Sequence, residues 1–215
     1  MSVCLVYIVQ NHLADLKQNL AHNLTLLSQY KDSRCIIVED GAVQNIRQYI
    51  RLHFPNVKYI KNTYQEGFSQ SFYKALELLS TDYMLLLDPS IRLDSCNIKS
   101  LCQTIKNEGA MAASLSVFKT GCKEQQFKQL FFKQGRLTIA DYTSKDVNQN
   151  INTVFCSEAM CFDTMKLKAC QGLNPTYFTS IYALYDCLFQ GVCAGWKVIS
   201  FHDVSLTYFG SNQRY

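Results

Sequence analysis

The segment YMLLLDPSIRLD, from Tyr83 to Asp94, begins as an unbroken apolar run and ends in acidic and turn-forming residues. Such a run is typical of a strand that is buried on both faces of a parallel sheet. Asp88 follows the run directly, and Pro89 then ends the strand because proline cannot donate a backbone hydrogen bond. An acidic side chain at the tip of a buried strand predicts a metal or phosphate site. The residue two positions on, however, is Ser90 and not a second carboxylate.

Similar apolar runs recur along the first half of the chain and alternate with amphipathic segments. The runs predict strands at residues 3–9, 34–40, 57–62 and 82–88. The segments between and after them have apolar residues at helical spacing, as Leu20, Leu24 and Leu27 do. These segments predict helices at residues 14–30, 42–54, 68–80 and 96–107. Such an alternation with short connections indicates right-handed βαβ units around a parallel sheet.

The second half of the chain has a more mixed pattern. Two β-rich runs within residues 127–142 flank Gln134 and Gly135, which predicts a hairpin. Further strands are predicted at residues 111–119, 152–163, 196–203 and 204–210, and helices at residues 164–170 and 178–195. We therefore expect a single α/β domain over residues 1–215, with a mostly parallel central sheet that becomes mixed in the second half.

Composition and charge limit the function and the location of the protein. The net charge is +4, but Lys and Arg form no run in the sequence, which argues against a nucleic-acid partner. None of the ten cysteines has Cys-x-x-Cys spacing, so we expect no zinc site and unpaired thiols in a reducing cytoplasm. No apolar run approaches about 18 residues, so no membrane span is predicted. Attachment to the inner face of the membrane is the alternative to a free cytoplasmic location.

Polar and acidic residues follow the predicted strands of the first half. The strands end in VQNH, EDGA, KNTYQEG and DPS. Ligands of open parallel sheets bind at the carboxyl ends of the strands, close to a switch in strand order. We therefore expect a binding site at this edge of the sheet. No Gly-x-Gly-x-x-Gly or Gly-x-Ser-x-Gly occurs in the expected places, which argues against a dehydrogenase and a serine hydrolase.

In this order along the chain, the motifs resemble those of the family 2 glycosyltransferases, which have the GT-A fold. Asn11 follows the first strand, although the proline and the tyrosine of the family signature are absent. VEDGA at residues 38–42 resembles the family's Val-Asp-Asp-Gly-Ser, and NTYQEG provides its Asn and Gly as Asn62 and Gly67. LLLDPS holds the place of the Asp-x-Asp metal signature, and the resemblance extends from Val3 to Ser211.

The resemblance implies a GT-A three-layer sandwich with a nucleotide-binding half, residues 1–107, and an acceptor half, residues 108–215. It implies transfer of a hexose from a nucleotide-diphosphate sugar to a glycan or a lipid-linked acceptor. A divalent cation, Mn²⁺ or Mg²⁺, would bridge the two phosphates, with Asp88 as its protein ligand. The nucleotide-binding residues that the resemblance implies are Asn11, Glu39, Asp40, Asn62, Gly67 and Asp88.

The metal signature departs from the family pattern at two positions. Ser90 replaces the second acid, and a neutral hydroxyl is a poor ligand for a hard cation. The late histidine of the family falls at Tyr208, with His202 six residues earlier. The candidate substitutes are Asp94 as a ligand, and Arg92 and Lys119 as cations that would neutralise the phosphates without a metal.

The catalytic base of the family is also displaced. Asp186 fits the last acid of the family's Glu-Asp-x-Asp helix, because Gly195 follows it by nine residues. The catalytic Glu-Asp pair then falls at Ala183 and Leu184, and neither side chain can accept a proton. The candidate catalytic acids that remain are Asp186 itself and Glu158.

Two functions follow from these departures, and the sequence leaves both open. The first is a diverged glycosyltransferase that is still active. The second is a catalytically inactive relative that serves as a binding or scaffolding subunit, either beside an active glycosyltransferase or through self-association. An unrelated nucleotide-binding α/β domain is a third interpretation.

Overall fold

The computed structural model describes residues 1–119, 126–134, 136–143, 154–156, 159–174, 176 and 180–209. Within these residues, strands and helices alternate as far as residue 87, a further strand and a helix reach residue 107, and a strand-rich half follows. The chain is thus an α/β protein, as the sequence predicts.

Parallel strands form the first half of the sheet. They are β1 (Val3–Val9), β2 (Arg34–Glu39), β3 (Lys58–Lys61) and β4 (Tyr83–Leu87). Their order is β3-β2-β1-β4, and β3 has no second neighbour among the described strands. The accompanying helices are α1 (Leu13–Leu27), α2 (Ile46–His53), α3 (Phe68–Leu78) and α4 (Ile98–Asn107). These elements confirm the predicted βαβ organisation.

The second half extends the sheet with strands of both directions. Its strands are β5 (Ile91–Cys96), β6 (Ala110–Lys119), β7 (Gln126–Lys133), β8 (Arg136–Thr143), β9 (Val154–Cys156), β10 (Ala159–Asp163) and β11 (Lys197–Tyr208). Its helices are α5 (Thr164–Ala169) and α6 (Ser180–Cys193). From β4 the path runs β4-β10-β6-β11-β5, with β10 antiparallel to both neighbours and β11 parallel to β6. The predicted change from a parallel to a mixed sheet is confirmed.

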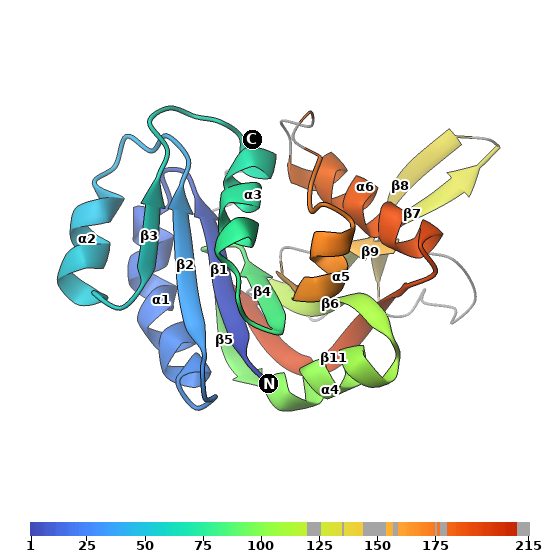
Figure 1. The fold of residues 1–215 in the computed structure, drawn as a ribbon, viewed down its shortest axis with the longest axis horizontal. Coiled ribbons are helices and arrows are strands. Elements are labelled where there is room, and N and C mark those ends of the chain that lie inside the picture. The colour runs from blue at the N-terminus through green and yellow to red at the C-terminus, as the bar shows by residue number, and fades with distance from the viewer. Residues whose placement is uncertain are drawn as a thin grey trace.

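The pleat of β1 divides the core into two layers. Val3, Leu5 and Tyr7 alternate with Cys4 and Val6, so the two sets face opposite sides of the sheet. The first set packs with apolar residues of α1, α2 and α4, and the second packs with those of α3, α5 and α6. The sheet is therefore the middle layer of the expected three-layer sandwich. Figure 1 shows α2 and β3 at one end of the molecule and the predicted β7–β8 hairpin at the other.

The structure adds one strand to those predicted and joins two others. No element was expected at residues 89–95, yet β5 begins at Ile91. Its alternation of buried Ile91 and Leu93 with Arg92 is short, and it follows Pro89 too closely to stand out in the sequence. The strands expected at residues 196–203 and 204–210 form the single strand β11, which carries a register irregularity.

Helix α2 is shorter than predicted. It begins at Ile46 and not at residue 42, because Asn45 caps it by accepting a hydrogen bond from the backbone N–H of Gln48 at 3.2 Å. In the part of the chain that the structure describes, no helix combines the length and the apolar character needed to cross a membrane.

Candidate functional site

The carboxyl ends of β1, β2 and β3 are joined by backbone hydrogen bonds that continue beyond the strands. The N–H of Asp40 donates to the carbonyl of Val9 at 2.9 Å. The N–H of Asn62 donates to the carbonyl of Glu39 at 2.8 Å. The residues that follow these strands are therefore held side by side at one edge of the sheet, as the sequence predicts.

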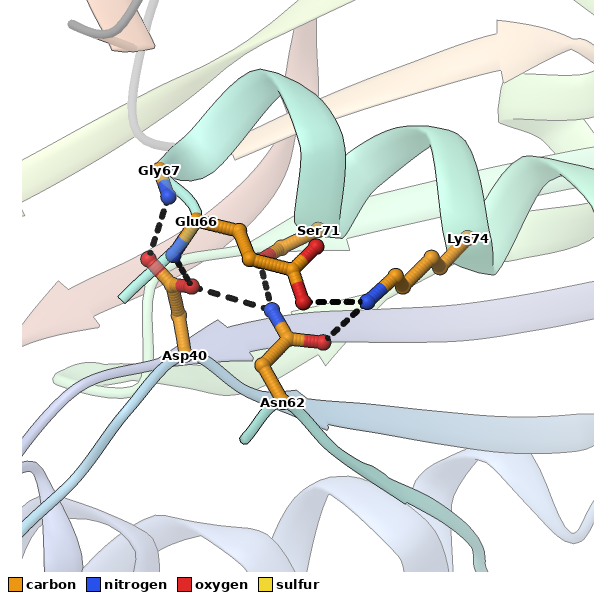
Figure 2. A network of polar contacts seen from close by, with 6 residues as sticks. All are labelled: Asp40, Asn62, Glu66, Gly67, Ser71 and Lys74. Atoms are coloured by element: carbon orange, nitrogen blue, oxygen red, sulfur yellow. Dashed lines mark hydrogen bonds and ion pairs between the residues drawn. The ribbon is translucent and has the colours of Figure 1, made fainter. Parts of the chain in front are cut away.

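The carboxylate of Asp40 organises the loop between β3 and α3 (Figure 2). Its Oδ1 accepts hydrogen bonds from Nδ2 of Asn62 at 2.9 Å and from the N–H of Glu66 at 2.8 Å. Its Oδ2 accepts from the N–H of Gly67, the N-cap of α3, at 3.0 Å. Asp40 is only 4% exposed, so these bonds are largely shielded from water. Both carboxylate oxygens are committed to holding this loop, and the negative charge lies favourably at a helix N-terminus.

Asn62 connects this carboxylate to α3. Its Nδ2 also donates to Oγ of Ser71 at 2.8 Å, and its Oδ1 accepts from Nζ of Lys74 at 2.8 Å. Lys74 forms an ion pair with Glu66 at 2.7 Å, as Figure 2 shows. The amide of Asn62 thus uses both donors and its acceptor within the protein. A closed polar network of this kind fixes the loop in one conformation.

The loops after β1 and β2 are tied to the same assembly. Gly41 has a φ of 67°, and a Cβ at this position would lie 2.5 Å from the backbone nitrogen of Gln65. Only glycine therefore allows the turn after β2 to approach the loop after β3 this closely. Asn11 also has a positive φ, and its Oδ1 accepts from the N–H of Val43 at 2.9 Å.

Glu39 is a buried carboxylate with unused hydrogen-bonding capacity. Its side chain is fully buried, and its Oε1 lies 3.0 Å from Nζ of Lys61, its register partner on β3. Neither carboxylate oxygen accepts a hydrogen bond of good geometry from any described residue. Burying a charge with a single ion-pair partner is unfavourable. Such a group is suited to accept a hydrogen bond from a ligand N–H.

The turn after β4 holds Asp88 in an unexpected way. Its Oδ1 accepts hydrogen bonds from the N–H of Ser90 at 2.9 Å and from the Ser90 hydroxyl. The N–H of Ile91 donates to the carbonyl of Asp88 at 3.0 Å. Ser90, which replaces the expected second acid, is 3% exposed and binds Asp88 itself. One oxygen of Asp88 is therefore occupied within the turn.

Helix α1 clamps this turn with side chains that the sequence analysis missed. Asn19 donates from Nδ2 to the carbonyl of Pro89 at 3.1 Å. Asn23 donates to the carbonyl of Ile91 and accepts from the N–H of Leu93, both at 2.9 Å. Both asparagines are buried. Their spacing of four residues on the buried face of an amphipathic helix was the available signal.

Both carboxylate oxygens of Asp94, the candidate second ligand, already have partners within the protein. Its Oδ1 pairs with Nε of Arg92 at 2.9 Å, and its Oδ2 accepts from the hydroxyl of Thr207. The guanidinium of Arg92 lies over the ring of Phe209, 4.5 Å from its centroid. The described residues contain no group of three His, Cys, Asp or Glu side chains that could hold a metal ion. Because Ser90 is neutral and both oxygens of Asp94 already have partners, the described side chains do not fit the expected two-carboxylate metal site.

Asp186, the candidate catalytic acid, lies on α6. Asp186 accepts a hydrogen bond at Oδ2 from Nε2 of Gln190 at 2.8 Å, within its own helix. Ala183 is fully buried and Leu184 is 7% exposed, so both positions belong to the core. Glu158 lies outside the described residues, and only the backbone is described for Lys119 and His202.

Tyr208, at the position of the family's late histidine, packs partly against the core cluster that contains α1. Its neighbour Phe209 donates a backbone hydrogen bond to the carbonyl of Ser90 at 2.9 Å. The end of β11 thus lies beside the turn that carries Asp88.

A sequence model described as "Glycosyl transferase family 2" matches residues 6–167 of the chain. No curated protein matches it. Solved structures of similar fold include a mannosyltransferase, PcManGT, from Pyrobaculum calidifontis in complex with GDP-Man and Mn²⁺. The TM-score is 0.72 at 11% identity, over 99% of this chain and 58% of that one.

Two further structures show the same likeness. GalNAc-T7 with UDP, GalNAc and Mn²⁺ gives a TM-score of 0.73 at 10% identity, over 99% of this chain and 44% of that one. TarS from S. aureus gives 0.69 at 12% identity, over 98% of this chain and 37% of that one. At such identities the likeness establishes the GT-A fold. The chain spans between 37% and 58% of the length of these proteins.

Proposed function

We propose that this chain binds a nucleotide-diphosphate sugar at the carboxyl ends of β1, β2 and β4 and transfers the sugar to a glycan or lipid-linked acceptor. The chain belongs to the glycosyl transferase family 2, whose sequence model matches residues 6–167. The observation that carries the proposal is Glu39, a buried carboxylate at the end of β2 with acceptor capacity left over. A ring N–H of uracil or a similar base is a suitable donor. Because Glu39 is fully buried, we expect Lys61, which is half exposed, to shift when a base binds.

The other predicted nucleotide-binding residues divide into two groups. Asn62 and Gly67 both donate hydrogen bonds to Asp40, so we assign these three residues the role of shaping the loop that borders the base. Asn11 is exposed and links two loops, and it is suited to contact the nucleoside. Asp88 has one oxygen free of the Ser90 turn, which suits a contact to a ribose hydroxyl or to the diphosphate side.

The two solved relatives that hold a nucleotide or nucleotide sugar also hold Mn²⁺, which would neutralise the diphosphate if bound here. In this chain the fit is poor, because Ser90 is neutral and Asp94 is already paired with Arg92. We therefore derive no step through Mn²⁺ or Mg²⁺. Among the residues that the structure describes, Arg92 is the candidate for binding phosphate without a metal. A guanidinium stays protonated and presents several N–H donors to phosphate oxygens.

A second candidate function is a catalytically inactive subunit that binds the donor or a partner. Transfer requires a base that removes the proton of the acceptor hydroxyl. The positions implied for that base are Ala183 and Leu184, and both lie in the core. This observation favours a binding or scaffolding role beside an active glycosyltransferase, or in a self-assembled complex. In either case we expect a cytoplasmic protein, free or attached to the inner face of the membrane.

Donor binding and donor turnover separate the two functions. The protein is mixed with UDP- and GDP-linked sugars, and thermal stabilisation and the release of nucleoside diphosphate are measured with a candidate glycan acceptor. Stabilisation with release supports the transferase, and stabilisation without release supports the inactive subunit. Glu39→Gln should lose the stabilisation, whereas Glu77→Gln, at an exposed position of α3, should keep it. A folded protein that responds to none of these donors contradicts the transferase and leaves the scaffolding subunit.

A further inference from the structure

Basic residues cluster on one edge of the fold. Residues 41–65 contain no Asp or Glu and carry four basic residues, Arg47, Arg51, Lys58 and Lys61. The sequence showed no basic run because the four are spread over helix α2 and edge strand β3. The fold brings these two elements together at one end of the molecule (Figure 1).

The arginines of α2 point away from the core. Ile46 and Ile50 are buried and anchor the helix, whereas Arg47 and Arg51, each one position later, are exposed. They lie one turn apart, on the same side of the helix. Neither forms a salt bridge with an acidic side chain of the described residues, so both guanidinium groups are available to an anion.

Residues of α2, β3 and the segment between them line a cavity with a cationic rim. Its volume is about 720 Å³, and Ile50, Phe54 and Val57 supply apolar parts of its lining. The side chains of Arg47, Arg51 and Lys61 also line it. A second hollow of about 450 Å³ lies beside Leu52 and shares the two arginines. The two arginines thus border both of these open hollows.

Large aliphatic side chains are exposed beside these cations. Val43, before α2, is 92% exposed, and Leu52, on α2, is 72% exposed. Basic residues interspersed with exposed aliphatic side chains on a helix are typical of surfaces that lie at a membrane interface. A nucleic acid offers phosphates but no apolar phase for these side chains, so the combination favours lipid.

We propose that the α2–β3 edge docks on an anionic membrane surface, with Arg47 and Arg51 contacting lipid phosphates and with Val43 and Leu52 entering the interface. Lys58, at the same edge, adds to the attraction. This inference goes beyond the proposed function and holds whether or not the chain transfers a sugar. Its basis is charge complementarity between the exposed arginines of α2, in a segment without Asp or Glu, and a lipid surface of opposite sign.

Vesicle co-sedimentation tests the proposal. We expect binding to vesicles of phosphatidylcholine mixed with phosphatidylserine, little binding to phosphatidylcholine alone, and release by high salt. The double variant Arg47→Gln/Arg51→Gln should bind about 30-fold more weakly, at the usual contribution of a basic residue near an anionic surface. The matched control is Lys31→Gln/Lys106→Gln, which removes the same charge from exposed positions elsewhere and should retain most of the binding.

Leu52→Ser separates insertion from simple charge attraction, and it should weaken binding without changing the salt dependence. Far-UV circular dichroism establishes that each variant is folded. Equal losses in the arginine and lysine double variants would overturn the proposal, because the whole surface charge would then act without a defined edge. So would no binding to anionic vesicles by folded protein, or displacement from the vesicles by inorganic pyrophosphate or single-stranded RNA.

Discussion

Replacing Asp40 with alanine tests whether this carboxylate organises the strand-end loops. The change removes the acceptor of three donors: the amide of Asn62 and the N–H groups of Glu66 and Gly67. Asn62 keeps its bond to Ser71, so the two backbone N–H groups carry most of the loss. A buried donor without an acceptor costs about 1–3 kcal/mol, and we expect a total of about 3–5 kcal/mol. For a domain of this size, that corresponds to a fall in Tm of about 6–20 °C.

Urea unfolding followed by circular dichroism measures the loss. Asp40→Asn should lose less stability than Asp40→Ala, because it keeps one acceptor oxygen. The matched control is Glu77→Ala, at an exposed position of α3, which should change the free energy of unfolding by less than about 0.5 kcal/mol. If Asp40→Ala costs less than about 1 kcal/mol, the network of Figure 2 does not stabilise the loop and the reasoning fails.

Three further outcomes are expected. Ser90→Asp places a second carboxylate beside Asp88 and should raise the affinity for Mn²⁺ at least tenfold in a calorimetric titration; an unchanged affinity would contradict the role given to Ser90. Asn23→Leu breaks the clamp of α1 on the turn after β4 and should cost about 2–4 kcal/mol in urea unfolding, whereas a neutral result would dismiss the clamp. Burial raises the pKa of the Cys4 thiol to about 12, so at neutral pH Cys4 should resist iodoacetamide while exposed Cys193 reacts, as mass spectrometry would detect. Because this pKa is raised in the folded state, its contribution to stability is fully present below about pH 9 and is lost as the pH rises toward 12.

The fold was predictable because its signals are local and repeated. The apolar run of β4 predicts a strand, and the leucines of α1 predict a helix. The alternation of such apolar and amphipathic segments predicts the parallel sheet. β5 was missed because its alternation covers few residues and follows Pro89 directly. The strand that pairs with β5 is β11, more than a hundred residues away in the sequence, and no local pattern predicts that pairing.

The candidate site was predictable in position but only partly in role. The carboxyl ends of parallel strands meet at one edge, so Glu39, Asp40 and Asp88 could be placed there from the sequence. Whether one of these carboxylates already accepts hydrogen bonds within the protein depends on donors from other segments. Examples are the N–H of Gly67 and the hydroxyl of Ser90. The basic edge was missed for the same reason, because four separated cations become neighbours only when α2 packs beside β3.

The proposed donor site is tested most directly by a calorimetric titration of the folded protein with UDP and with GDP, in Mn²⁺ and in EDTA. We expect that one of the two nucleotides binds, that binding persists in EDTA, and that Glu39→Gln weakens it at least tenfold. Binding that requires Mn²⁺ would contradict the judgement that Asp88 and Ser90 no longer fit a metal. The absence of binding by folded protein under either condition would contradict the proposed donor site itself.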